Sequence, residues 1–370
     1  MNRREWIQWL CGSALATGSV SVWPASNALM RQYDHPTPLR LPVLPADYGP
    51  HPDYKNEWWY FTGWFTSPTL PEPFGMQVTF FRNAPEVDLR NPSRFNPDQL
   101  IIGHAAVSLP SKKRLMHAQK VSRAGYVNDY IRGGKKALEL RLGDWTLQSE
   151  QGESWLCNIQ TNDFAVQWKA KQTQPPWFQG LNGFSQKGPT LSESSYYITL
   201  PHLQVEGTLE LDGKRHAVTG SFWMDHEWSS TVLSPNAAGW DWVGLQGNAG
   251  QSIMAFRIRP KNPNDPVIWK YAAQRDNAGH VHVYNQVKFE TLQQWLSPHT
   301  GIRYPVSQAL HLDDETYTLI PLFADQELDA RGSTGNQYWE GAVQVTGPSA
   351  NSAWGKGYLE MTGYDRPMTL

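Results

Sequence analysis

The sequence predicts an all-β protein, and three observations carry this prediction. Apolar and polar residues alternate over short stretches broken by Gly, Pro, Asn and Asp, which is typical of strands joined by turns. Of the 370 residues 18% are charged and 12% aromatic, with 18 tryptophans, a composition that favours strands over helices. No stretch shows the period of a long amphipathic helix. Many short antiparallel strands at this spacing predict sandwiches or barrels.

The expected strands fall into two groups, and the length of the chain suits two domains. We expect the first domain over residues 29–229 and the second over 230–370. The first group of strands covers 58–65, 75–82, 104–109, 136–142, 144–149, 164–170, 195–200, 203–211 and 216–224, and the second covers 240–246, 252–260, 267–274, 280–289, 316–323, 338–347 and 356–364.

A weak internal repeat supports two similar units. Residues 57–63 (EWWYFTG) followed by 75–82 resemble residues 239–244 (GWDWVG) followed by 251–259. Each copy joins an aromatic strand with a glycine to a second strand that carries an aromatic residue and an arginine. Coincidence is the alternative. If the repeat is real, the boundary lies near residues 229–238, whose Ser, Pro, Asn and Ala are typical of a linker.

The N-terminus reads as an export signal. Residues 1–28 contain the twin arginines Arg3 and Arg4, a weakly apolar stretch and then small residues, which favours a Tat-type signal over a membrane anchor. We therefore expect a periplasmic or secreted protein. After the signal is removed, Cys157 is the one remaining cysteine, so no internal disulfide is expected, and Cys157 is interpreted as a buried apolar residue.

Several functions are excluded or disfavoured by what the sequence lacks. The net charge is -2 and there is no basic run, so nucleic acid is not an expected partner. No phosphate-binding or dinucleotide-binding glycine motif and no G-x-S-x-G motif is present. His280 and His282 have a spacing that can bind a metal, but they follow a probable hairpin turn and are interpreted as an exposed strand start. We expect neither a metal nor another cofactor.

The segment SFWMDHEWSS, residues 221–230, is the main candidate for chemistry. On a strand, His226 and Trp228 would share one face, while Trp223, Asp225 and Glu227 would share the other. One interpretation is an exposed strand end. The functional interpretation is that Asp225 or His226 faces an aromatic cavity, where burial raises the pKa of a carboxyl and makes it a usable general acid.

The first aromatic strand offers a second cluster. Glu57 precedes Trp58, Trp59 and Tyr60, and we interpret it as a buried carboxylate that accepts hydrogen bonds from indole N–H groups. Of the residues in the 221–230 segment, Glu227 is expected to lie outside the cavity.

Ten motifs are spread in order over nearly the whole chain, at residues 51–63, 76–82, 175–188, 194–201, 223–229, 239–246, 295–305, 321–327, 338–345 and 357–364. With these motifs the sequence resembles the AttH-like family of predicted secreted hydrolases, which also contains the carotenoid 1,2-hydratases. The resemblance implies two tandem lipocalin-like antiparallel β-barrel domains. It also implies an acid site at Asp225 and His226, with Asp241 as a second carboxylate, and an aromatic surround.

The leading hypothesis is a protein that binds an apolar or isoprenoid-like small molecule and hydrates or hydrolyses it by acid catalysis. Because carotenoid synthesis takes place at the cytoplasmic membrane, an exported protein fits a carotenoid substrate poorly. The alternative is a non-catalytic carrier that works with an ABC-type export permease and contacts the membrane peripherally. A carbohydrate-binding β protein is a third hypothesis. The expected catalytic residues are Asp225, His226 and Asp241, and the expected ligand-binding residues are Glu57, Trp58, Trp59, Tyr60, Trp223, Trp228, Trp240 and Trp242.

Overall fold

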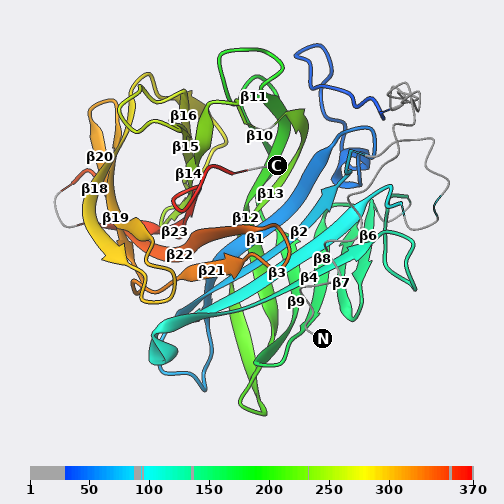
Figure 1. Ribbon diagram of the computed structural model, residues 1–370. Helices are drawn as coiled ribbons and strands as arrows, with labels where there is room; N and C mark the ends of the chain where they lie inside the picture. The colour runs from blue at the N-terminus through cyan, green and yellow to red at the C-terminus, as the bar shows by residue number, and fades with distance from the viewer. Residues whose placement is uncertain are drawn as a thin grey trace, which may run out of the picture.

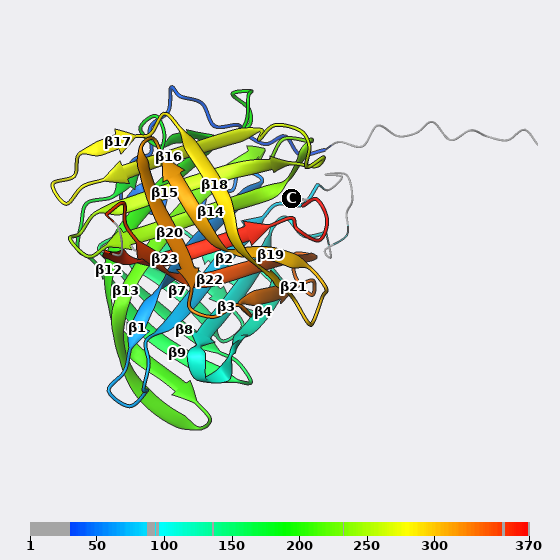
Figure 2. The same cartoon turned by 90° about the vertical axis from the view of Figure 1, so that its left-hand side faces the viewer.

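The protein folds into two antiparallel β-sheets (Figures 1 and 2). The export signal expected over residues 1–28 lies outside the described residues. No helix in the part of the chain that is described has the length and apolar character needed to span a membrane. The computed structural model describes residues 30–368 except 87–92, 94–95, 135–136, 232 and 350–351.

The first sheet has the strand order β4-β3-β2-β1-β13-β12-β9-β8-β7-β6-β5, and β10 and β11 pair with β12. Short 3-10 helices lie at Ala46–Tyr48 (η1) and Pro110–Lys112 (η2). The strands are β1 (Asn56–Thr66), β2 (Phe74–Asn83), β3 (Leu100–Leu109), β4 (Arg114–Arg123), β5 (Tyr130–Arg132), β6 (Leu138–Leu142), β7 (Trp145–Glu150), β8 (Ser154–Gln160), β9 (Phe164–Gln172), β10 (Trp177–Phe178), β11 (Phe184–Gln186), β12 (Ser194–Leu211) and β13 (Lys214–Thr231).

The second sheet has the order β17-β16-β15-β14-β23-β22-β20-β19-β18, with β21 paired to β22. Its strands are β14 (Ala237–Gly247), β15 (Ser252–Pro260), β16 (Trp269–Arg275), β17 (Val281–Val283), β18 (Val287–Leu296), β19 (Arg303–Leu312), β20 (Glu315–Pro321), β21 (Glu327–Ala330), β22 (Asn336–Thr346) and β23 (Ala353–Thr362).

The two sheets have the same plan. In each, the first strand lies between the second strand and the last strand, and the penultimate strand carries the short extra strands. Each sheet also curls, because β4 contacts β6 in the first and β16 contacts β18 in the second. The predicted all-β class is confirmed: one sheet is a half-barrel, and the pair is consistent with two tandem lipocalin-like domains.

Strand alternation produces three large hydrophobic clusters, and a fourth, small one joins β3 and β4 to β21 and β22. Inward-facing residues of the first sheet, such as Trp59, Phe61 and Cys157, form its core. The second sheet encloses its own core around Trp339 and Leu359. The opposite faces of the first strands meet in a third cluster between the sheets. There β1 contacts β23 and β2 contacts β22, as the blue and red-orange strands in Figure 1 show.

Candidate active site

A cavity of about 340 Å³ lies between the two sheets. Its walls come from β1, β2, β3, β12 and β13 of the first sheet and from β14, β15, β22 and β23 of the second. Most of its surface is apolar. The aromatic side chains that line it are Trp58, Tyr60, Phe81, Tyr197, Trp240, Trp242, Phe256 and Tyr338.

Two reciprocal hydrogen bonds cross the cavity between the sheets. The Tyr60 hydroxyl on β1 donates to Oε1 of Glu340 on β22, at 2.5 Å. The Trp242 indole N–H on β14 donates to the Tyr197 hydroxyl on β12, at 2.9 Å. Tyr60 and Trp242 occupy matching positions, since each lies on the first strand of its sheet and faces a carboxyl residue of the last strand. The two domains are therefore fixed to each other by the residues that line the cavity.

Alternation along β13 decides which residues of the 221–230 segment reach the cavity. Asp225 and Glu227 line it, whereas His226 and Trp228 point to the other side of the sheet, into or beside the first core. Trp223 shares the face of Asp225 and packs in the cluster between the sheets, 6.0 Å from Trp242 between ring centroids. The expectation that Glu227 lies outside was wrong, because residues two apart on a strand share one face.

Asp225 is 2% exposed and is held by two hydroxyl groups. The Tyr197 hydroxyl donates to Oδ2 at 2.7 Å, and the Thr199 hydroxyl donates to Oδ1 at 2.6 Å. Burial raises the pKa of Asp225 to about 7, against the opposing effect of these hydrogen bonds. A carboxyl with that pKa carries a proton in a large share of molecules at neutral pH, which is what a general acid requires.

Beside Asp225 lies a buried ion pair. The ammonium Nζ of Lys187 is 3.1 Å from Oε1 of Glu227. The same ammonium lies over the rings of Tyr197 and Phe256, 4.4 and 4.3 Å from their centroids. Burial lowers the pKa of Lys187, although Glu227 opposes this effect. Lys187, which lies just after the short strand β11, falls in the matching segment 175–188 but was not among the predicted site residues.

The wall formed by the second sheet carries two further carboxyls, Glu340 on β22 and Glu360 on β23, which occupy directly opposite positions. Burial raises the pKa of Glu340 well above its usual range and that of Glu360 to about 7. Their strands were predicted, but their meeting with Asp225 was not.

Tyr338 of this wall meets His104, which lines the cavity from β3 of the first sheet. The Tyr338 hydroxyl lies 2.7 Å from Nδ1 of His104, whose Nε2 lies 2.8 Å from Oγ of Ser333. Burial lowers the pKa of His104 to about 3, so the imidazole is neutral. Ser333 also donates to Oε1 of Gln119, at 2.6 Å, so His104 Nε2–H donates to Ser333 and Nδ1 accepts from Tyr338.

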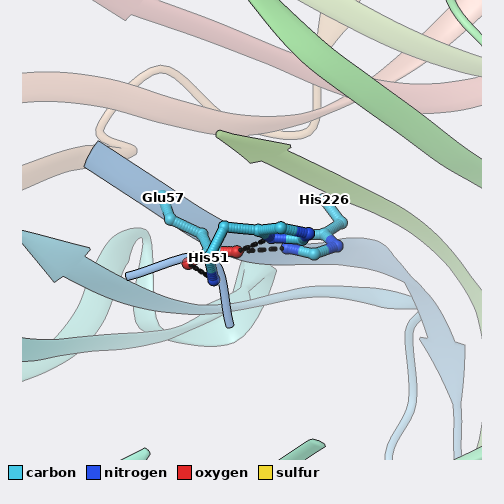
Figure 3. A group of neighbouring side chains, drawn as sticks. All are labelled: His51, Glu57 and His226. Carbon is cyan, nitrogen blue, oxygen red and sulfur yellow. Dashed lines mark hydrogen bonds and ion pairs between the residues drawn. The ribbon is translucent and has the colours of Figure 1, made fainter. Parts of the chain in front are cut away.

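Glu57 lies at the edge of the cavity, where two histidines (Figure 3) and an arginine bind its carboxylate. Its Oε1 accepts from Nδ1 of His51 at 2.7 Å and from Nε2 of His226 at 2.9 Å. Its Oε2 accepts from Nε of Arg82 at 2.7 Å and from the backbone N–H of His51 at 2.9 Å. The carboxylate is bound by these groups and not by the expected indole N–H groups.

The same three residues, His51, Glu57 and His226, have ligand atoms within 4.8 Å of one another, a spacing that metal sites also have. The donor chemistry does not fit an ion, because Arg82 already neutralises the carboxylate. Burial alone would raise the pKa of Glu57, but the charges of His51 and Arg82 hold it well below its usual range. This cluster joins strands β1, β2 and β13 to His51, which precedes β1 in the chain.

Asp241 has a similar setting inside the second sheet, away from the cavity. Nε of Arg257 donates to its Oδ2 at 2.6 Å, Nε of Arg259 to its Oδ1 at 3.1 Å, and the Tyr364 hydroxyl to Oδ1 at 2.9 Å. Asp241 and Arg257 are cross-strand partners on β14 and β15, as Glu57 and Arg82 are on β1 and β2. The repeated sequence thus places a buried carboxylate and an arginine on the first two strands of both sheets.

The remaining predicted residues divide between two environments. Trp58, Tyr60, Trp240 and Trp242 line the cavity. Trp59 lies in the core of the first sheet, where its ring stacks on His226.

A model of the AttH-like family matches residues 35–364 of this sequence. The chain belongs to the AttH-like family. A solved structure described as an AttH from Nitrosomonas europaea is 43% identical and superimposes with a TM-score of 0.82, covering 89% of this chain and 98% of that one.

Two less similar structures share the fold. Kievitone hydratase from Nectria haematococca is 16% identical with a TM-score of 0.67, covering 90% of this chain and 96% of its own. CghA is 14% identical with a TM-score of 0.55, covering 91% of this chain and 98% of its own. No functionally curated protein shows significant similarity to the sequence.

Proposed function

We propose that this AttH-like protein binds an apolar small molecule between its two domains and adds water to it, or hydrolyses it, with Asp225 as the proton donor. The observation that carries the proposal is the setting of Asp225, which is buried in an aromatic cavity with two hydroxyl donors and no direct cationic partner among the described residues. The fold shared with a protein named as a hydratase supports this reaction class.

The chemistry follows from the groups around the cavity. Asp225 gives its proton to one carbon of a double bond, and a cation develops on the other carbon. The faces of Trp58, Tyr60 and Trp242 stabilise that positive charge. Water then adds to the cation, and the proton that it loses returns to the Asp225 carboxylate, which restores the acid.

His226 and Asp241 take positioning roles in this proposal. His226 donates to Glu57 behind the strand that presents Asp225, and Asp241 holds the two arginines of the second sheet. Neither side chain touches the cavity ligand in this scheme.

Location and partners extend the proposal. The twin arginines of the expected export signal support action outside the cytoplasm. There the protein would contact the membrane peripherally and exchange its ligand with an ABC-type export permease. The same apolar molecule would be the ligand whether the protein converts it or passes it to a permease.

The test compares Asp225→Asn with Glu206→Gln, an exposed carboxylate on the same sheet. Each protein is purified in its native state, extracted, and its ligand identified by mass spectrometry. Turnover of that ligand is then followed by incorporation of oxygen from ¹⁸O-labelled water. We expect Asp225→Asn to retain the ligand and to lose turnover by about 10²- to 10⁴-fold, with Glu206→Gln unchanged. Equal turnover in both variants would contradict acid catalysis by Asp225, and a bound but unconverted ligand in the wild type would favour the carrier.

A further inference from the structure

The carboxyl pair on the wall of the second sheet has no role in the scheme above. Glu340 and Glu360 are Cα partners on β22 and β23, so their side chains leave the sheet on one face with Cβ atoms about 4.5–5.5 Å apart. Both line the cavity, and Glu340 is fully buried. Two acids therefore share one small region of an apolar wall.

The hydrogen bonds of Glu340 are incomplete. Its Oε1 accepts from the Tyr60 hydroxyl, whereas its Oε2 is buried and has no hydrogen-bond partner among the described residues. Within the same part of the chain, neither Glu340 nor Glu360 forms an ion pair with lysine, arginine or histidine. A buried carboxyl oxygen without a partner, on a residue that lines a cavity, is a group that a ligand can satisfy.

The groups around the pair do not supply a positive charge. The titratable side chains that face it are Tyr60 from β1, His104 from β3, Asp225 and Glu227 from β13, Tyr338 on β22 and Tyr358 on β23. Lys187 is engaged by Glu227. The negative charges of the neighbouring carboxylates favour the protonated forms of Glu340 and Glu360. The imidazole of His104 is neutral and therefore does not favour their ionisation.

At least one member of the pair must therefore be protonated, since two carboxylates this close in an apolar wall cannot both ionise. Burial raises the pKa of both groups, as described above. Because Tyr60 donates to Oε1 of Glu340, the proton of Glu340 lies on Oε2. The Glu340 carboxyl is thereby left with an O–H donor that has no acceptor among the described residues, in the wall of the cavity.

We propose that Glu340 and Glu360 form a hydrogen-bond-donating subsite for the acceptor oxygen of an uncharged ligand, namely the carbonyl oxygen of an apolar carbonyl compound. This inference rests on the proposed function, because it assigns the substrate class of the same cavity. Asp225 lies on the opposite sheet, so the carbonyl is held at one side while the proton donor acts at the other. Once the pair loses a proton, the remaining O–H bridges the two carboxyls and a negative charge faces the ligand oxygen. Affinity for a carbonyl compound therefore falls as pH rises through about 7.

The probe is prodan, an uncharged naphthyl ketone whose fluorescence shifts to the red when its carbonyl accepts a hydrogen bond. Binding is titrated at pH 6 and pH 8.5 in an Asp225→Asn background, which removes the other carboxyl that titrates near 7. We expect affinity to fall about fivefold or more over this range, the effect of one net hydrogen bond.

Two matched substitutions identify the donors. Glu340→Gln with Glu360→Gln keeps N–H donors at both positions, so prodan should bind with an affinity that no longer depends on pH. Glu340→Met with Glu360→Gln removes the donor of Glu340, so affinity should fall about fivefold and the emission should shift to the blue. Circular dichroism and urea unfolding establish that each variant is folded.

The outcomes separate the two proposals. Failure of wild-type protein to bind prodan would overturn both the cavity site and the subsite. Binding with no dependence on pH or on residue 340 would overturn the subsite and leave the proposed function standing. Displacement of prodan by decyltrimethylammonium that strengthens as pH rises would show that the pair binds cations, which would also overturn the subsite.

Discussion

The buried carboxylates inside the sheets and those between the sheets differ in one respect, the presence of a guanidinium. Glu57 and Asp241 each face an arginine on the neighbouring strand. Asp225, Glu340 and Glu360 face hydroxyl and aromatic groups instead. The pKa of Glu57 is accordingly lowered and that of Asp225 is raised to about 7. Glu57, Asp241, Asp225 and Glu340 are all buried, so the cation decides whether such a carboxyl serves as an anchor or as an acid.

The largest expected effect comes from removing the cation of an anchor. Arg82→Met should lower the free energy of unfolding by about 3–5 kcal/mol, because it leaves the Glu57 carboxylate without its buried guanidinium partner and loses two hydrogen bonds to backbone carbonyls. Urea unfolding at pH 7 measures this. Lys120→Met, which removes a partly exposed cation of the same sheet, is the control and should change stability by less than about 1 kcal/mol. Equal losses of stability in the two variants would show that Arg82 contributes no more to the fold than a surface cation does.

The anchor of the second sheet should be weaker. Asp241→Asn should cost roughly 2–3 kcal/mol, because its two arginines are partly exposed and can be solvated when the carboxylate is lost. Hydrogen exchange should increase in β14, β15 and β23 and remain unchanged in β6 to β9. An increase spread over both sheets would show that the two anchors do not act separately.

For Asp225, a carboxyl that lines the cavity, removal of the ionisable group should stabilise the protein, and the gain should increase with pH. The pKa of Asp225 is about 7 in the folded protein against 3.8 for the free side chain, so ionisation destabilises the fold. The contribution of the protonated group is fully present below pH 3.8 and is lost as pH rises towards 7. Asp225→Asn should therefore gain stability relative to wild type over this window, by roughly 2 kcal/mol between pH 4.5 and pH 6. Unfolding by urea at pH 4.5, 6 and 7.5 tests the trend, and a constant difference would contradict it.

The smallest effect concerns the bonds between the sheets. Tyr60→Phe removes the donor to Glu340 and should cost about 1 kcal/mol, as should Trp242→Phe, which removes the donor to Tyr197. If the two bonds act together in fixing the domains, the double variant should differ from the sum of the single ones in a double-mutant cycle. Additive values would show that each bond acts alone.

Much of the fold could be predicted from sequence because period-two alternation is a local property. It locates β1 and β2 to within two residues and the start of β13, although β13 runs on to Thr231. The repeat of glycine, aromatic and arginine residues reflects a match between β1–β2 and β14–β15. The strands β4 and β19 were not predicted, nor were β8 and the short strands β5, β10, β11 and β21. β4 contacts β21 of the other sheet, and β19 buries polar residues such as Gln308, so neither alternates cleanly.

The site could be predicted only in part, for a physical reason. Alternation shows that Asp225 and His226 face opposite ways, but it cannot show which face meets the cavity, since both faces of β13 are buried. Glu340 and Glu360 join Asp225 only when the second sheet closes over the first. Lys187 lies in an irregular segment, where no pattern distinguishes a buried lysine from an exposed one.

The shared strand order of the two sheets has a consequence for the ancestry of the site. An ancestor with one such sheet would hold half a cavity and would have needed a second copy of itself to close it, with identical chemistry at both poles. Duplication within one chain releases the halves from that symmetry. Asp225 has Thr199 as its cross-strand neighbour, whereas Glu360 has Glu340 at the matching position. The two ends of the cavity therefore differ: one carries Asp225 held by hydroxyl groups, and the other carries the Glu340–Glu360 pair. A cavity with unlike ends can bind a ligand in a single direction.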